Sequence, residues 1–190
     1  LYSDGTLANQ IDGLQKLVAD NGLGTVGGID SNTWAFWRNK VQSAAAPLQG
    51  GGAVVISKDT IEAQWLHLWL SLTRGDDAPD LIVCDNNRFA TFEASQVSLK
   101  RYTEADTAKG GFQKLKYKSA DVIFDGGSGI PADHSYFLNT DYLELVAHTD
   151  ADMEVMEEMK PINQDAAVIP ILWMGNTTCS NRSLQGVEKA

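Results

Sequence analysis

The sequence contains very little cysteine. Cys84 and Cys179 are the only cysteines, and they lie far apart in the chain. Small secreted domains held together by disulfides carry many more, so that class is excluded. Cys84 belongs to an apolar run and is expected to be a small core residue rather than a disulfide partner. This cysteine usage is typical of a reducing compartment.

Positive charge is also scarce. Lys and Arg number 15 against 25 Asp and Glu, which gives a formal net charge of −10 at pH 7. Nucleic-acid binding requires a basic surface, so we expect no sequence-specific nucleic-acid partner. No apolar run approaches the roughly 20 residues of a membrane-spanning helix, and no signal peptide is recognisable. We therefore expect no membrane partner either.

Histidine is too sparse to suggest a metal site. His67, His134 and His148 do not form a metal-ligand spacing such as H-x-x-x-H. The aspartates of segment 76–80 lack the glycine and distal glutamate of a calcium loop. The segment 22–27 (GLGTVG) follows a predicted helix rather than a strand, so it does not fit a dinucleotide-binding loop. We predict neither a metal nor another cofactor.

Apolar residues are abundant, at 43% of the chain, and the segment 59–84 has the clearest apolar pattern. Large apolar side chains recur there at the spacing of one helix face; they are Ile61, Trp65, Leu68, Trp69 and Leu72. Leu66 and Leu70 add a second stripe, so the helix is predicted to be covered on two sides. Asp59 is the predicted N-cap, and Gly75 the predicted left-handed end. Leu81–Cys84 is predicted to be a buried strand.

The remaining patterns predict a mixture of helices and strands. We expect amphipathic helices over Asp4–Asn21 and Asn87–Tyr102. Strands are expected at Val54–Ile56, Phe112–Lys118, Ala120–Phe124, Tyr136–Asn139 and Tyr142–Ala147, and a long apolar strand at Ala166–Met174. Pro170 makes the last of these an edge or bulged strand. Asp150–Lys160 is expected to be a short helix or a loop, and Gly175–Val187 a polar chain end. This order of elements indicates the α+β class.

The segment 44–52 (AAAPLQGGG) resembles a hinge because it combines a proline with consecutive glycines. It is the predicted boundary between two subdomains.

Aromatic and basic residues lie together in the segment 34–40. Large aromatic side chains and Arg dominate the energetics of protein interfaces. We therefore predict that Trp34, Trp37 and Arg38, together with Arg182, contact neighbouring subunits. A core role for the two tryptophans remains an alternative, and stacking on nucleic-acid bases fits the acidic chain less well.

Asp133 and His134 form the one local Asp/His pair of the sequence. Ser128 or Ser135 would complete the ingredients of a hydrolytic triad, but no G-x-S-x-G elbow is present. A triad is defined by its geometry, which the sequence does not provide. A hydrolase that uses Asp133 and His134 is therefore kept as an alternative, and our prediction is that the chain is not an enzyme.

Nearly the whole chain resembles the major capsid proteins of tailed bacteriophages, the family with the HK97-type fold. The runs that carry the resemblance are TVGGIDSNTWAFWRN (25–39), PDLIVC (79–84), RY (101–102), GFQKLKY (111–117), ADVIFD (120–125), IPADHSYFLNT (130–140) and GNTTCSNRSLQGV (175–187). They are runs typical of the family rather than a catalytic signature.

The resemblance implies an A domain with a central sheet flanked by helices, and an elongated P domain with a spine helix and long strands. Residues 1–45 and 150–176 would be P-domain-like, with Asp4–Asn21 as the spine helix. Residues 46–149 and 177–190 would be A-domain-like. The family's N-terminal arm and extended loop are missing, and the sequence starts at Leu1. We therefore expect an N-terminally truncated piece of a longer protein, whose own ability to assemble is open.

The function implied by the resemblance is structural. Such a head protein of a phage or prophage associates with itself, as pentamers and hexamers, into an icosahedral shell that encloses DNA. Scaffold, portal or decoration proteins would be further partners. The protein would be found in the virion, and in the bacterial cytoplasm before assembly. An encapsulin-like compartment shell, which shares the fold but encloses enzymes, is a second alternative beside the hydrolase.

Overall fold

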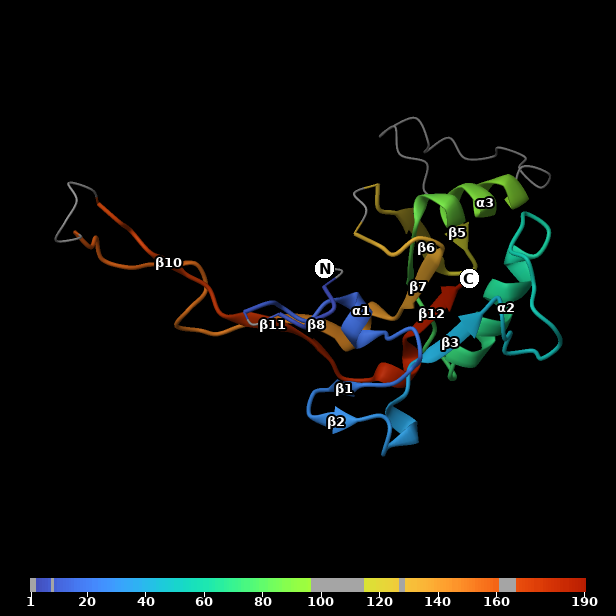
Figure 1. The fold of residues 1–190 in the computed structure, drawn as a ribbon, viewed down its shortest axis with the longest axis horizontal. Coiled ribbons are helices and arrows are strands. Elements are labelled where there is room, and N and C mark those ends of the chain that lie inside the picture. The colour runs from blue at the N-terminus through green and yellow to red at the C-terminus, as the bar shows by residue number, and fades with distance from the viewer. Residues whose placement is uncertain (1–2, 8, 97–114, 127–128, 161–166) are drawn as a thin grey trace.

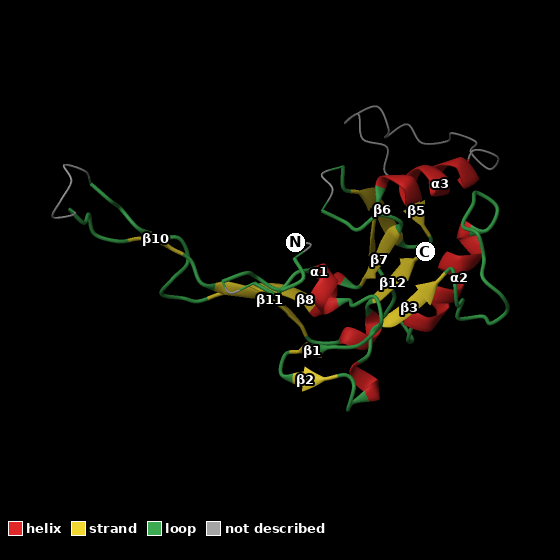
Figure 2. Cartoon of the chain, in the orientation of Figure 1, coloured by secondary structure: helices red, strands yellow, loops and turns green. Residues whose placement is uncertain are grey.

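A six-stranded mixed sheet forms the centre of the fold (Figure 2). The structure is a computed structural model and describes residues 3–7, 9–96, 115–126, 129–160 and 167–190. In space the strand order is β3, β12, β7, β4, β6, β5. Their bounds are Lys40–Ser43 (β3), Leu81–Cys84 (β4), Leu115–Tyr117 (β5), Ala120–Phe124 (β6), His134–Leu138 (β7) and Gly186–Lys189 (β12). β12 is parallel to β3, β4 is parallel to β6, and the other neighbours are antiparallel.

Two helices pack against one face of this sheet, α2 (Ile61–Leu72) and α3 (Asn86–Gln96) (Figure 1). Fully buried side chains from the helices and from β4, β6 and β7 form the main apolar cluster. Its largest members include Trp65, Leu68, Phe92, Ile82 and Phe137. Burying each such side chain stabilises the fold by roughly 1.5–3 kcal/mol. This helix-on-sheet layer therefore supplies much of the stability of the body.

The predicted central helix is confirmed, but its surroundings differ from the prediction. Thr60 rather than Asp59 is the N-cap. Gly75 has the expected left-handed φ of +62°, but it does not end the helix, which stops at Leu72 with Thr73 as an extended C-cap. Gly75 lies in the turn between Arg74 and Asp77. Leu66 and Leu70 are 37% and 60% exposed, so the predicted cover on a second side is wrong. One side of α2 packs on the sheet, and its opposite side is exposed to solvent.

The predicted helix over Asp4–Asn21 is wrong for most of its length. Among the described residues of this segment, the structure forms one short helix, α1 (Leu14–Leu17). Gly5 and Asn9 have left-handed φ angles of +65° and +64°, which interrupt a right-handed helix. Leu14, Leu17 and the following Val18 are nevertheless buried, because they pack on the second face of the sheet.

A long arm leaves the body on one side (Figure 1). At its base, β8 (Leu143–Ala147) pairs with β11 (Gly175–Cys179), and further out β9 (Glu154–Val155) pairs with β10 (Ile171–Leu172). The segment predicted as helix or loop after residue 150 thus contains a short strand. The long strand predicted to end at Met174 is reduced to β10 and one bridge between Met159 and Val168. Its edge character is confirmed, since it pairs on one side only among the described residues.

The glycine motif of segment 22–27 leads into a tight hairpin. β1 (Thr25–Val26) pairs with β2 (Ile29–Asp30), and Gly27 and Gly28 form the turn with φ of +60° and +77°. Positive φ at both central residues is the requirement of a type I′ turn. The glycines therefore serve a turn, which agrees with the rejection of a nucleotide-binding loop.

Several strands differ from the predictions in their presence or their bounds. β3 was not predicted, and the predicted strand over Val54–Ile56 is not formed. The predicted polar chain end Gly175–Val187 contains β11 and the start of β12, and β12 lies inside the sheet. β6 has its predicted bounds, and β4, β5, β7, β8 and α3 fall within or close to theirs. The parts of these predictions on residues 97–114 lie outside the described residues.

The predicted domain division is not tested by the fold. The segment 44–52 connects β3 to the segment before α2, and its Gly50 and Gly51 have positive φ angles. β3, from the part assigned to the P-like domain, pairs with β12. The division at this segment stays a prediction.

Gly186 allows α2 to lie close to β12. A Cβ at this position would be 2.7 Å from Leu72 Cδ1 and 3.0 Å from Leu68 Cδ1, and both leucines are fully buried. Gly186→Ala is therefore expected to lower the free energy of unfolding by about 1–3 kcal/mol, as overpacking does. Chemical denaturation measures this. Gly52→Ala is the control, because a Cβ there has nothing within 4 Å, and an equal loss in both variants would contradict the prediction.

Candidate assembly surfaces

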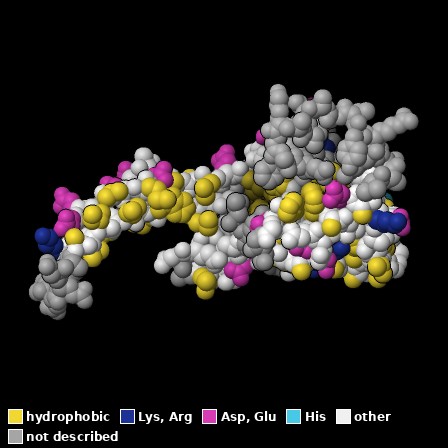
Figure 3. All heavy atoms as spheres, turned by 90° about the horizontal axis from the view of Figure 1, so that it is seen from above, with side chains coloured by type: hydrophobic (Ala, Val, Ile, Leu, Met, Phe, Trp, Pro, Cys, Tyr) yellow, Lys and Arg dark blue, Asp and Glu magenta, His cyan; other side chains and the backbone are white. Residues whose placement is uncertain are grey.

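The arm exposes a continuous series of apolar side chains. Figure 3 shows hydrophobic side chains along the length of the arm. Between 44% and 66% of each of these side chains is exposed, and they are Met153, Val155, Met156, Met159, Val168, Ile169, Ile171 and Met174. We call this set the arm surface. A two-stranded ribbon has no interior in which to bury them, and monomeric proteins rarely leave a large apolar patch in water.

The polar residues of the arm are mainly acidic. Asp150, Asp152, Glu154, Glu157 and Glu158 are all exposed there. Lys160 lies 4.0 Å from Glu158 and forms an exposed ion pair with it. The arm surface thus combines apolar side chains with an excess of negative charge.

The β1–β2 hairpin and the short helix η1 (Ala35–Trp37) carry an aromatic surface. Trp34 and Phe36 are 55% and 65% exposed, with ring centroids 6.1 Å apart. Trp37 is half-buried, and its indole N–H donates to the Val26 carbonyl at 3.1 Å. Trp34 is therefore available for contact with another molecule, whereas Trp37 also holds η1 against the hairpin.

Arg38 lies on the same aromatic surface but is tied to its own chain. Its Nε donates to the Ser31 carbonyl at 2.8 Å, and its Nη2 to the Asn32 carbonyl at 3.2 Å. The residue remains exposed, so part of its guanidinium can still meet a partner. That Trp34, Trp37 and Arg38 contact neighbouring subunits stays a prediction.

Arg182, in the short helix η4 (Arg182–Leu184), is fully buried in its own subunit. Its Nε donates to the Leu17 carbonyl at 2.7 Å, and its other nitrogens donate to the carbonyls of Leu23 and Gly24 and to Ser31 Oγ. Burial lowers the pKa of this guanidinium from its ordinary value. A side chain enclosed in this way fixes the segment 17–31 against η4 and has no surface to offer to a neighbour.

The side chains of Asp133 and His134 do not contact each other. His134 Nε2 lies 3.1 Å from Asp20 Oδ2, and its Nδ1 lies 2.7 Å from the Ala132 carbonyl. Asp133 has a left-handed φ of +60°, and its carboxylate lies 3.8 Å from Arg88 Nη1. Both ring nitrogens of His134 are therefore engaged away from Asp133, which does not match a triad built on this pair.

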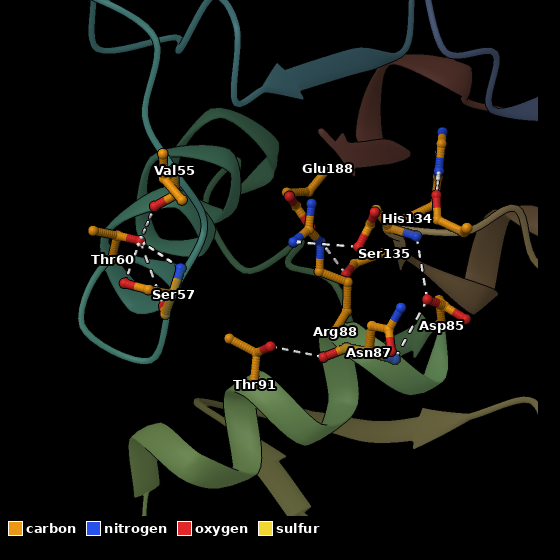
Figure 4. A network of polar contacts seen from close by, with 12 residues as sticks. Val55, Ser57, Thr60, Asp85, Asn87, Arg88, Thr91, His134, Ser135 and Glu188 are labelled. Atoms are coloured by element: carbon orange, nitrogen blue, oxygen red, sulfur yellow. Dashed lines mark hydrogen bonds and ion pairs between the residues drawn. The ribbon is translucent and has the colours of Figure 1, made fainter.

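Ser135 belongs to a buried polar cluster that the sequence analysis missed. Its hydroxyl donates to Glu188 Oε2 at 3.0 Å, and Arg88 Nε lies 3.2 Å from the same oxygen. Figure 4 shows Arg88 reaching from α3 towards Ser135 and Glu188. Burial raises the pKa of Glu188, although Arg88 opposes the shift. Ser128, the other candidate nucleophile, lies outside the described residues.

The two cysteines are free and buried, as expected for Cys84. Burial raises the pKa of the Cys84 thiol. In the described part of the chain, no group of three or more His, Cys, Asp or Glu side chains is placed to hold a metal ion. The aspartates of segment 76–80 instead serve the fold: Asp77 accepts from Tyr142 Oη at 3.1 Å, and Asp80 accepts from the Thr140 amide at 2.8 Å. Among the described helices, none is both long and apolar enough to cross a membrane.

No protein-family model and no curated protein matches the sequence. A solved structure does match: a chain of the cyanophage A-1(L) capsid asymmetric unit, with a TM-score of 0.56 and 16% sequence identity. The match covers 93% of this chain and 59% of that chain, so this chain spans well under two thirds of the other's length. At this identity the likeness establishes the fold. The chain has a mixed α+β fold like that of a phage capsid protein.

Proposed function

We propose that the chain is part of a phage or prophage major capsid protein with the HK97-type fold, whose function is to associate with copies of itself into a shell. The likeness to a capsid chain supports the fold, and the arm surface is the observation that carries the function. The HK97-type division into A-like and P-like parts, with the arm in the P-like part, belongs to the same proposal.

The arm surface supports self-association for an energetic reason. Burying apolar surface contributes roughly 25 cal/mol per Å², and specific interfaces bury about 1,200–2,000 Å² in total. An extended ribbon exposes its side chains on both faces, so it reaches more partner surface than a rounded body of equal size. The exposed Trp34 offers a second contact at the η1 end, since Trp is enriched among residues that dominate binding energy.

The test is assembly of the protein as its gene encodes it. Light scattering after size exclusion and negative-stain electron microscopy would show closed shells, or rings of five or six subunits. DNA inside purified particles would support a virion head, whereas a protein cargo would support a compartment shell. A monomer at every salt and protein concentration would contradict the proposal.

A charged substitution in the arm provides a prediction specific to the arm surface. Val155 and Ile171 are paired across β9 and β10, and both are exposed. Val155→Lys with Ile171→Lys is expected to abolish shells or reduce their yield at least about tenfold, because burying two lysines costs several kcal/mol. Folding stability should change by less than about 0.5 kcal/mol, as at other surface sites.

The matched control is Val55→Lys on the body, where the side chain is also exposed. This variant should assemble as the wild type does. Shells of normal yield from the arm variant would show that assembly does not use the arm surface.

A further inference from the structure

The segment from Asp12 to Asp20 connects the base of the arm to the central sheet. At one end, the Asp12 amide donates to Asn176 Oδ1 at 2.7 Å, and Asn176 Nδ2 donates to Asp12 Oδ2 at 3.2 Å. Asn176 lies in β11, which is part of the arm base. At the other end, Asp20 Oδ2 lies 3.1 Å from His134 Nε2 at the start of β7. The segment is thus a brace between arm and body.

The middle of this brace is packed by apolar contacts. Leu14, Leu17 and Val18 are buried against the sheet face that carries Tyr136 and Val187. Apolar packing does not depend on pH, so it holds the middle of the segment under all mild conditions. The bonds at the two ends differ, because one of them involves a group that titrates near neutrality.

Both nitrogens of the His134 ring face oxygen atoms that can only accept. Nδ1 lies 2.7 Å from the Ala132 carbonyl, and Nε2 lies 3.1 Å from the Asp20 carboxylate. A neutral imidazole has one N–H and could donate to one of them, which would leave its bare nitrogen against the other oxygen. The imidazolium ion donates to both. The geometry is therefore matched to charged His134.

We propose that His134 and Asp20 form a pH-dependent clamp, which fastens the brace, and through it the base of the arm, to the central sheet. The clamp is closed while His134 carries its proton. When the ring loses that proton, one hydrogen bond and the attraction to Asp20 are lost together, and the Asp20 end of the brace is released.

The charges around the ring agree with this assignment. On β12, Lys189 is paired with His134, and Glu188 with the next residue, Ser135. The Asp85 amide at the end of β4 donates to the His134 carbonyl at 3.0 Å. Asp133 precedes the ring in its own loop, and Arg88 of α3 lies 3.8 Å from the Asp133 carboxylate. The aromatic neighbour is Tyr136, whose ring is stacked at 6.4 Å. With Asp20 included, this set contains four acidic groups against two basic ones, which favours the protonated ring.

The pKa shifts have the matching directions. Burial of His134, which is 14% exposed, would lower its pKa, but the bonds to Asp20 and Ala132 and the charges of Asp20 and Glu188 outweigh burial and raise the pKa above the ordinary 6.5. The hydrogen bond from His134 lowers the pKa of Asp20 below its ordinary 3.8, against the effect of burial. The clamp therefore contributes fully from about pH 4 to about pH 6.5, and is lost as the pH rises through the raised pKa of His134.

NMR titration of the His134 ring tests the clamp directly. The pKa of His134 is expected above 6.5, and Asp20→Asn should lower it. A His134 pKa at or below 6.5 that Asp20→Asn does not move would overturn the proposal.

Hydrogen exchange of the amides in segment 14–20 tests the consequence for the brace. After correction for the intrinsic exchange rate, the opening equilibrium of this segment should increase between about pH 6 and pH 9. The expected increase is about tenfold for each unit by which the NMR pKa of His134 exceeds its value in Asp20→Asn. The part of this increase that depends on His134 should be absent in His134→Gln. Glu188 also titrates with a raised pKa, and comparison with His134→Gln removes its part.

Equal corrected exchange at both pH values in the wild type would overturn the clamp. These measurements need no assembled shell. Their failure would leave the capsid proposal untouched, and failure of assembly would leave the clamp untouched. If the protein assembles as proposed, the clamp would also set the direction of the arm during assembly. That consequence alone rests on the proposed function.

Discussion

Replacing Trp65 with Ala is expected to lower the free energy of unfolding by about 3–5 kcal/mol. Trp65 is fully buried in α2 at the centre of the main apolar cluster. Its ring stacks on Phe92 with centroids 4.5 Å apart, and it makes edge contacts with Tyr117 and Phe137 at 5.4 Å each. Removing it leaves a cavity shared by α3, β5 and β7, and such a rigid surround cannot collapse to fill the space.

Leu70→Ala is the matched control on the same helix. Leu70 is exposed, so the substitution should change the free energy of unfolding by less than about 0.5 kcal/mol. Urea denaturation followed by tryptophan fluorescence for the control, and by circular dichroism for both variants, gives the two values. Losses of similar size would mean that α2 does not pack through the Trp65 face.

Arg182→Leu is expected to cost about 3–5 kcal/mol of stability. Hydrogen bonds to a charged group contribute about 1.5–3 kcal/mol each, and relief of the cost of burying the cation offsets part of their sum. The carbonyls of Leu17, Leu23 and Gly24 lose their hydrogen bonds from Arg182, although Gly24 still accepts from Ser31. The segment 17–31 is then held to η4 by apolar contacts alone, so its amides should exchange faster than those of α2.

Arg182→Lys separates charge from geometry. Lysine keeps the cation but cannot direct donors to several carbonyls at once, so its stability should lie between those of the wild type and the leucine variant. Arg74→Leu, at an exposed position after α2, is the control for loss of one surface arginine. An Arg182→Leu protein as stable as the wild type but unable to assemble would return Arg182 to the predicted contacts between subunits.

The central layer was predictable because its signals are local. The helical spacing from Ile61 to Leu72 and the apolar run of β4 each bury a face that can be identified from consecutive residues. Gly75 and the Gly27–Gly28 turn follow equally local rules, since positive φ is nearly free only for glycine. The resemblance to capsid proteins also came from short local runs, and the fold likeness agrees with it.

The errors arose where distant residues decide the outcome. Gly175–Val187 was predicted to be a polar chain end, yet β12 begins within it and lies inside the sheet. Arg88 of α3 and Ser135 of β7 accommodate the carboxylate of Glu188 in that strand. Arginine is a residue type that often contacts partners at a surface, which suggested that role for Arg182. In the structure, carbonyls from the segment 17–24 instead accept its hydrogen bonds. No pattern in the sequence could pair residues that lie more than 50 positions apart, as these do.

The sequence by itself determined the periodic core of α2 and β4, the glycine turns, the absence of a disulfide framework and the acidic charge. Tertiary structure decided the burial of Arg182 and Glu188 and the pairing of His134 with Asp20. The physical reason is the same in each case. Apolar periodicity and turn chemistry act between neighbours in the chain, whereas a buried charge or a bridging hydrogen bond needs partners that only the folded chain brings together.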